Sequence, residues 1–198
     1  TNYKETFRIT KVNFCHVKLD SLDFELESVT TEDSRKYTTP DGKVYPSITT
    51  VLSSYNKMAL FEWRQRVGEE EANRVKKKAA DRGTKLHKLC EDYINNEISP
   101  IFLTKIMPDL KENFNKVRKH IDASVGRVYA QEQALYSDRL RIAGRVDLIC
   151  EWNGKLSIVD FKTSTKVKEE DWIENYFLQC TAYALMFHER TGMWIDDI

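Results

Sequence analysis

Residues 144–164 read Gly-Arg-Val-Asp-Leu-Ile-Cys-Glu-Trp-Asn-Gly-Lys-Leu-Ser-Ile-Val-Asp-Phe-Lys-Thr-Ser, and the rest of the chain is organised around this stretch. Two runs rich in Val, Ile and Leu flank Asn153-Gly154, a dipeptide that supplies the positive φ angles of a type I′ two-residue turn. The pattern predicts a β-hairpin in which Trp152 faces Lys155. This register fixes which side chains meet across the two strands.

Two aspartates and a lysine come together in the predicted hairpin. Asp147 lies directly opposite Asp160, and alternation along the strand brings Lys162 to the same side. Facing residues have Cβ atoms roughly 5 Å apart, and like charges at that distance destabilise a sheet. A divalent cation held by both carboxylates removes the repulsion, and hard oxygen ligands suit Mg²⁺ or Mn²⁺. Lys162 can then reach a phosphate oxygen or a nucleophilic water beside the ion.

The alternative is a pair of surface aspartates, one of them paired with Arg145 or Lys162. Apolar residues on both faces favour a buried hairpin instead. These residues are Val146, Leu148, Cys150, Ile158, Val159 and Phe161.

Composition indicates a globular chain. Its 198 residues are 41% hydrophobic and 31% charged, which excludes a disordered protein and fits one domain. We expect strands and a loop in residues 1–45, a helical region in 46–127, and the core sheet with a C-terminal helix in 128–198. The 31 basic residues balance the 31 acidic ones, so the net charge does not point to a polyanionic partner.

The helical region carries a run of positive charge. Residues 57–95 read as nearly continuous helix, with expected breaks at Gly68 and Gly83. A charge run of this kind is either a solvated face or a basic arch that follows a nucleic-acid backbone. The basic residues are Arg64, Arg66, Arg74, Lys76, Lys77, Lys78, Arg82 and Lys85.

Four motifs resemble those of the PD-(D/E)XK nuclease superfamily, and in particular its RecB-type exonuclease branch. They are Gly144-Arg-Val-Asp147, Val159-Asp160-Phe-Lys162-Thr, Gly83-x-x-x-His87-x-x-x-Glu91 and Gln179-x-x-x-Tyr183. The resemblance implies an α/β fold with a restriction-endonuclease-like core. In such a fold helices flank a central mixed β-sheet, and a helical arch precedes the core strands.

The resemblance also implies roles for individual residues. Asp147, Asp160 and Lys162 would be catalytic, and one or two Mg²⁺ or Mn²⁺ ions would bind Asp147, Asp160, His87 and the backbone carbonyl of Phe161. Spacing alone favours a structural role for a lone helical histidine such as His87. Glu132 is a further candidate metal ligand, or equally a glutamate at a strand edge in solvent. Supporting roles fall to Glu91, Gln179 and Tyr183.

Expected DNA contacts are distributed along the chain. Ser47 and Thr49 lie in a Pro-Ser-x-Thr segment that resembles one near the DNA path of these nucleases, although Ser47 can equally be only the N-cap of a helix. The other expected contacts are Arg74, Lys77, Lys78, Arg82, Lys85, Arg145 and Thr163.

The function implied is metal-dependent exonucleolytic hydrolysis of DNA, from single-stranded ends, in replication, recombination or repair. A structure-specific or restriction-like endonuclease is one alternative, and a nucleic-acid-binding recombination subunit with a vestigial site is another. No iron–sulfur cluster is expected, because the four cysteines lack the close spacing found in some RecB-type relatives. Without a signal peptide or a long apolar run, we expect no membrane association and a bacterial or phage-infected cytoplasm, or the mitochondrial matrix if the chain is eukaryotic.

Overall fold

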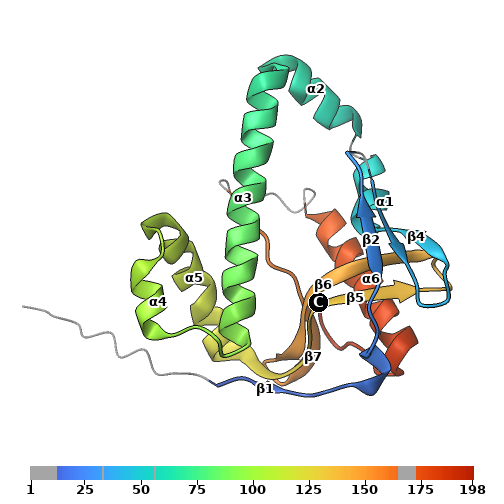
Figure 1. Cartoon of the computed structure of the whole chain (residues 1–198), viewed down its shortest axis with the longest axis vertical. Helices are drawn as coiled ribbons and strands as arrows, with labels where there is room; N and C mark the ends of the chain where they lie inside the picture. Colours follow the sequence, from blue (N-terminus) through green and yellow to red (C-terminus); the bar gives the residue numbers. More distant parts are fainter. Residues whose placement is uncertain (1–12, 33, 56, 165–172) are drawn as a thin grey trace, which may run out of the picture.

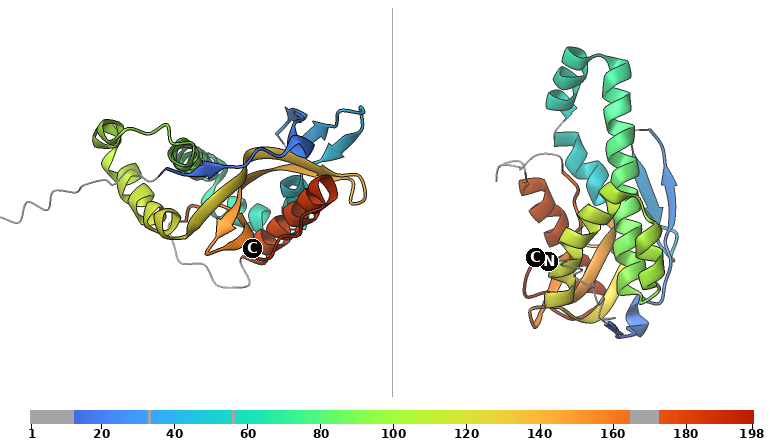
Figure 2. Two further views of the ribbon diagram at one scale, coloured as in Figure 1. Left: turned by 90° about the horizontal axis from the view of Figure 1, so that it is seen from below. Right: turned by 90° about the vertical axis from the view of Figure 1, so that its left-hand side faces the viewer.

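The computed structural model describes residues 13–32, 34–55, 57–164 and 173–198. A four-stranded sheet lies at its centre, with helices on both faces (Figures 1 and 2). β1 runs parallel to β5, whereas the other neighbouring strands are antiparallel, so the predicted mixed sheet is confirmed. In spatial order the strands are β1 (Cys15–His16), β5 (Val125–Ser137), β6 (Ile142–Trp152) and β7 (Lys155–Val159).

The hairpin of β6 and β7 has the predicted register. Trp152 pairs with Lys155, and the ladder runs to the pair Leu148 and Val159. Asn153 and Gly154 adopt φ angles of 52° and 81°, as a two-residue type I′ turn requires. Local turn chemistry therefore determines which residues face each other across the strands.

Two apolar clusters attach the helices to the sheet. α3 (Glu69–Ile94) and α5 (Pro108–Ser124) cover one face, where Leu148 and Cys150 are fully buried. α6 (Glu174–Thr191) and α1 (Ile48–Tyr55) cover the other face, and a short helix, α4 (Pro100–Lys105), precedes α5. Each fully buried aliphatic side chain contributes about 1.5–3 kcal/mol to this packing. Within the described ranges, no helix is long and apolar enough to cross a membrane.

A small second sheet lies beside the α6 end of the molecule. It consists of β2 (Glu27–Thr30), β3 (Arg35–Thr38) and β4 (Val44–Pro46), and a single 3₁₀ turn (Asp20–Leu22) precedes it. β3 and β4 form a hairpin around residues 40–42, with Gly42 at φ 82°. The polar run 30–36 predicts the loop of this region, and the prediction is wrong at both ends, because Thr30 of β2 pairs with Arg35 of β3 and Val29 pairs with Lys36.

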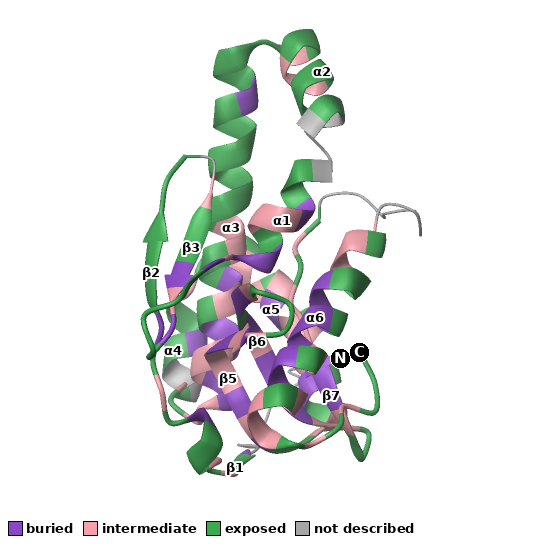
Figure 3. Cartoon of the chain, turned by 90° about the vertical axis from the view of Figure 1, so that its right-hand side faces the viewer, coloured by how far each residue is buried: buried purple, intermediate pink, exposed green. Residues whose placement is uncertain are grey.

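A helical arch projects from the sheet. It is formed by α2 (Lys57–Val67) and α3, and the chain turns between them at Gly68, which has φ 86°. The expected break at Gly83 is wrong: α3 continues through it, since one glycine costs only about 1 kcal/mol among strong helix formers. In Figure 3 most residues of α2 and of the outer part of α3 are exposed, and Ala72 is a buried exception.

Candidate active site

Asp147, on the central strand β6, is the hub of the site. Its Oδ2 accepts a hydrogen bond from the Phe161 backbone N–H at 2.8 Å and lies 3.4 Å from His87 Nδ1. His87 comes from α3, and its ring meets the Phe161 ring edge-on, with centroids 6.1 Å apart. The end of the hairpin and the helix above it therefore orient the same carboxylate. The role of the Phe161 backbone carbonyl as a metal ligand stays a prediction.

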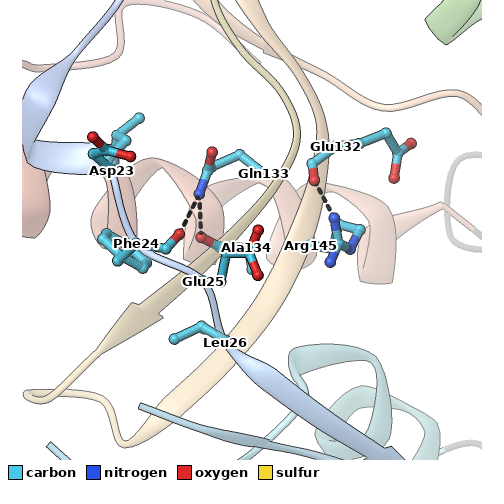
Figure 4. A pocket seen from close by; sticks show the side chains of 9 residues that line it. Asp23, Phe24, Glu25, Leu26, Glu132, Gln133, Ala134 and Arg145 are labelled. Carbon is cyan, nitrogen blue, oxygen red and sulfur yellow. Dashed lines mark hydrogen bonds between the residues drawn. The ribbon is translucent and has the colours of Figure 1, made fainter. Parts of the chain in front are cut away.

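Glu132, on β5, completes a cluster of ligands. The flanking pairs Gln131–Leu148 and Gln133–Val146 place it across from Asp147, and ligand atoms of His87, Glu132 and Asp147 all lie within 4.8 Å of one another. The residue has a φ of 47°, the left-handed region that costs a non-glycine residue about 1–2 kcal/mol. Figure 4 shows the consecutive side chains of Glu132 and Gln133 pointing in opposite directions.

Asp160 and Lys162 form a second group beside this cluster. The Asp160 carboxylate is only 6% exposed, and its Oδ2 contacts Lys162 Nζ. Its Oδ1 accepts a hydrogen bond from Gln179 Nε2 at 3.2 Å, and the same amide lies 3.2 Å from Tyr183 Oη. The ring of Tyr176 lies 5.4 Å from Lys162 Nζ, which is a cation–π distance. Asp160 and Lys162 thus contact each other, and residues of α6 contact both of them.

The electrostatics of the site favour a cation. Burial raises the pKa of the Asp147 carboxyl, and the negative charge of Asp160 raises it further. Burial also raises the pKa of the Glu132 carboxyl, and the negative charges of Asp147 and Glu91 raise it further. Carboxylate oxygens with one imidazole are donors that suit Mg²⁺ or Mn²⁺, so the residues present fit a divalent ion.

The cluster opens into a cavity of about 490 Å³. Arg35, Thr84 and Lys88 line it and were not predicted. Thr84 and Lys88 lie within one helical turn of His87, so helical spacing could have identified them. Arg35 comes from the distant β3, and nothing local in the sequence signals it.

Glu91 of α3 and Arg145 of β6 line the catalytic cavity. The Glu91 carboxylate lies 3.2 Å from Lys88 Nζ, and the Glu91 backbone carbonyl accepts a hydrogen bond from Gln131. Arg145 lines the same cavity and donates to the Glu132 backbone carbonyl. Thr163 lies beside α3, where a Cβ added at Gly83 would be in ordinary van der Waals contact with the Thr163 hydroxyl, at 3.8 Å.

The expected DNA contacts in the Pro-Ser-x-Thr segment have local partners. Ser47 is 2% exposed, and its Oγ accepts the Thr50 N–H at 3.0 Å. The structure therefore gives Ser47 the helix-capping role. Thr49 is exposed, with its hydroxyl 2.9 Å from that of Ser47.

The five basic residues expected to bind DNA from α3 are not in the catalytic cavity. They line a separate groove between α3 and α5, on a different face of α3 from the one that carries His87. Their contact with DNA stays a prediction. The five are Arg74, Lys77, Lys78, Arg82 and Lys85.

Replacing Glu132 with Gly is expected to stabilise the metal-free protein by about 1 kcal/mol while abolishing activity. Glycine adopts a positive φ without steric cost, and the substitution also removes a carboxylate next to Asp147. Urea unfolding with a chelator present measures the change. Glu132→Ala is the matched control, since it removes the carboxylate but keeps the Cβ. Equal stability of the two variants would show that the backbone at this position is unstrained.

The site and the mixed sheet that carries it define a class of protein. Residues 101–194 match the model of the PD-(D/E)XK nuclease superfamily. That range contains the candidate ligands Glu132 and Asp147 and the pair Asp160 and Lys162. This part of the chain is therefore similar to a PD-(D/E)XK nuclease domain.

Three relatives share one name, Mitochondrial genome maintenance exonuclease 1. The protein of Homo sapiens is 31% identical over 153 residues, which are 71% of this chain and 43% of the relative. That of Xenopus tropicalis is 25% identical over 185 residues, or 88% of this chain and 52% of the relative. That of Mus musculus is 26% identical over 131 residues, 62% of this chain and 38% of the relative. The chain is thus homologous to these exonucleases at low identity and spans about half of their length or less.

Proposed function

We propose that this chain is a divalent-metal-dependent exonuclease that hydrolyses phosphodiester bonds from the ends of single-stranded DNA. The observation that carries the proposal is the convergence of His87, Glu132 and Asp147 within 4.8 Å, next to the ion pair of Asp160 and Lys162. A protein that only binds nucleic acid has no use for buried carboxylates with raised pKa values.

Hydrolysis needs an activated water, neutralisation of the transition-state charge and help for the leaving oxygen. His87, Glu132 and Asp147 would hold a divalent ion, which would lower the pKa of a water and supply positive charge near the phosphate. The Phe161 N–H fixes one Asp147 oxygen, so the carboxylate keeps its orientation. Asp160 lies beside this carboxylate and is the fourth candidate ligand.

Lys162 is the group that would face the phosphate. The Lys162 side chain is 35% exposed, although that of its partner Asp160 is only 6% exposed. The charged head therefore stays in reach of substrate while Asp160 and the Tyr176 ring hold its position. From there its N–H donors can orient the attacking water and stabilise the negative charge that develops on the phosphate. Gln179 keeps Asp160 in place through the other oxygen.

Single strands suit the arch that stands over the cavity. Three large apolar side chains of α2 are exposed, Met58 at 70%, Leu60 at 55% and Phe61 at 53%. Unpaired bases offer apolar faces that stack on such side chains, and a duplex hides them. The exposed apolar surface of α2 therefore favours single-stranded DNA over duplex DNA in this proposal.

Linear and circular single-stranded DNA distinguish the proposal from its alternatives. With Mg²⁺ or Mn²⁺ the protein is expected to degrade the linear form completely and leave the circle intact, because an exonuclease needs an end. An endonuclease would linearise the circle, and a binding subunit would only retard both forms in a gel. Either outcome contradicts the proposal. Labelling one end at a time gives the polarity, and a ribose strand tests the preference for DNA.

A role in DNA maintenance is part of the proposal and rests on the relatives' shared name. The same name supports the mitochondrial matrix as the compartment over the bacterial or phage-infected cytoplasm. Localisation of the tagged protein in its own cells tests the compartment.

A further inference from the structure

The groove between α3 and α5 is a second feature with the character of a binding site. Five basic residues of α3 line it, at spacings of one, three or four residues, so they form one stripe along the helix. From Arg74 to Lys85 the stripe is about 16 Å long, at 1.5 Å per residue. The catalytic cavity lies on a neighbouring face of α3, about a third of a turn away, where Thr84, His87 and Lys88 line it.

The opposite wall of the groove is largely apolar. Met107 and Leu110 line it from the α5 side, with Asn113 as a polar neighbour, and the cavity measures about 390 Å³. Met107 is 60% exposed. An apolar wall facing a line of cations suits a ligand that has a charged edge and an apolar body.

The groove keeps a net positive charge after its acidic neighbours are counted. Arg74 is paired with Glu71 through two bonds of 2.7 Å. Among the described residues, no carboxylate lies within ion-pair distance of Lys77, Lys78 or Lys85, and Nε of Arg82 is buried without a hydrogen-bond partner. Two acidic residues, Asp81 and Asp109, also line the groove and leave a net positive charge.

We propose that this groove is a second polynucleotide site, which holds the phosphate backbone of a single strand whose end lies in the catalytic cavity. The inference rests on the proposed function, since it assigns the groove to the same substrate. Cations repeated along a line match successive phosphates, and the apolar wall matches sugars and unpaired bases. A groove between two helices in contact is too narrow for more than one strand, because helix axes in contact lie about 8–10 Å apart.

A strand that occupies both sites must pass around α3. A third of the circumference of a helix 10–12 Å wide is about 10–13 Å, so only strands longer than a few nucleotides can reach from one site to the other. In Figure 1 the outer part of α3 projects beyond α5, which leaves room for that passage. The groove should then strengthen binding of long strands and leave short ones unaffected, as expected for two linked sites.

The test compares two triple variants. Lys77→Ala/Lys78→Ala/Lys85→Ala removes three charges from the groove, and alanine keeps α3 helical. Lys18→Ala/Lys43→Ala/Lys155→Ala removes three exposed charges from other elements, with side chains 76%, 51% and 63% exposed. Fluorescence anisotropy with a chelator present measures binding of a labelled oligothymidylate of about 30 nucleotides over a range of salt concentrations. That length exceeds the roughly 4–16 nucleotides of typical single-strand sites.

For the groove variant we expect affinity about 10-fold weaker and a slope of log K against log salt reduced by roughly 2, at about 0.7 per phosphate contact. Its cleavage of an oligothymidylate of about 4 nucleotides should equal that of the wild type, and the control variant should match the wild type throughout. An unchanged salt slope would overturn the inference. Loss of cleavage of the short strand would also overturn it, because the groove would then belong to the catalytic site. The salt slopes of the wild type and the groove variant could differ as expected while the wild type degrades no DNA. That result would disprove the proposed function and leave the groove assignment standing.

Discussion

Asp147→Asn and Lys162→Ala are each expected to reduce the rate of DNA degradation by about 10³-fold or more. Asparagine can still accept the Phe161 N–H, so the first variant loses a negative charge and a metal ligand without losing that hydrogen bond. The second variant loses the ammonium group that would act on the attacking water and the phosphate. Single-turnover degradation of end-labelled single-stranded DNA at saturating Mg²⁺ measures both rates.

The control for these variants is Asp20→Asn, which removes a carboxylate 93% exposed on the 3₁₀ turn. It should retain the wild-type rate. Circular dichroism and thermal unfolding must show all three variants folded. Wild-type activity in either site variant would refute the assignment of that residue.

Gly144→Ala is expected to lower the free energy of unfolding by about 1–3 kcal/mol and to impair the site as well. A Cβ at this position would lie 2.7 Å from Tyr183 Cε1 and 3.1 Å from Ile48 Cγ2. Tyr183 is 2% exposed and has no free space to move into. Any displacement also moves its hydroxyl away from Gln179, which holds Asp160. Chemical denaturation and the degradation rate report the two effects.

Gly83→Ala is the matched substitution, and it is expected to raise the free energy of unfolding instead of lowering it. Its Cβ would meet only the Thr163 hydroxyl, at 3.8 Å, and it lies within α3. Alanine in a helix interior is more stable than glycine by about 0.5–1 kcal/mol, so this variant should unfold at higher denaturant concentration. A Gly144→Ala variant as stable as the wild type would show that Tyr183 does not pack as tightly as the structure indicates.

The central hairpin could be predicted because its determinants are local. Asn153-Gly154 selects the turn, and the turn selects the register that brings Asp147 near the end of the second strand. His87 is assigned to the site by the resemblance of its helical motif, whereas spacing alone favours a structural role. The shared structural reason is that each motif lies within a single element or a single tight turn.

Other parts depend on tertiary contacts that no local pattern contains. The side-chain direction of Glu132 follows from a left-handed backbone angle within β5, whereas the sequence left open whether it was a ligand or a solvent-exposed glutamate. The basic residues of α3 point to α5 because α3 rotates to bury Leu86 and Cys90 against the sheet. Arg35 enters the cavity from a different sheet. Residues 1–12 of the expected N-terminal strands lie outside the described residues, as do residues 165–172.

Calorimetric titration with Mn²⁺ tests the metal centre most directly, because it needs no nuclease activity. The wild type and Lys162→Ala should bind the ion with equal affinity, and Asp147→Asn should bind it at least about 10-fold more weakly. Binding by Asp147→Asn as tight as by the wild type, or no binding by the wild type, would contradict the metal centre proposed for this fold.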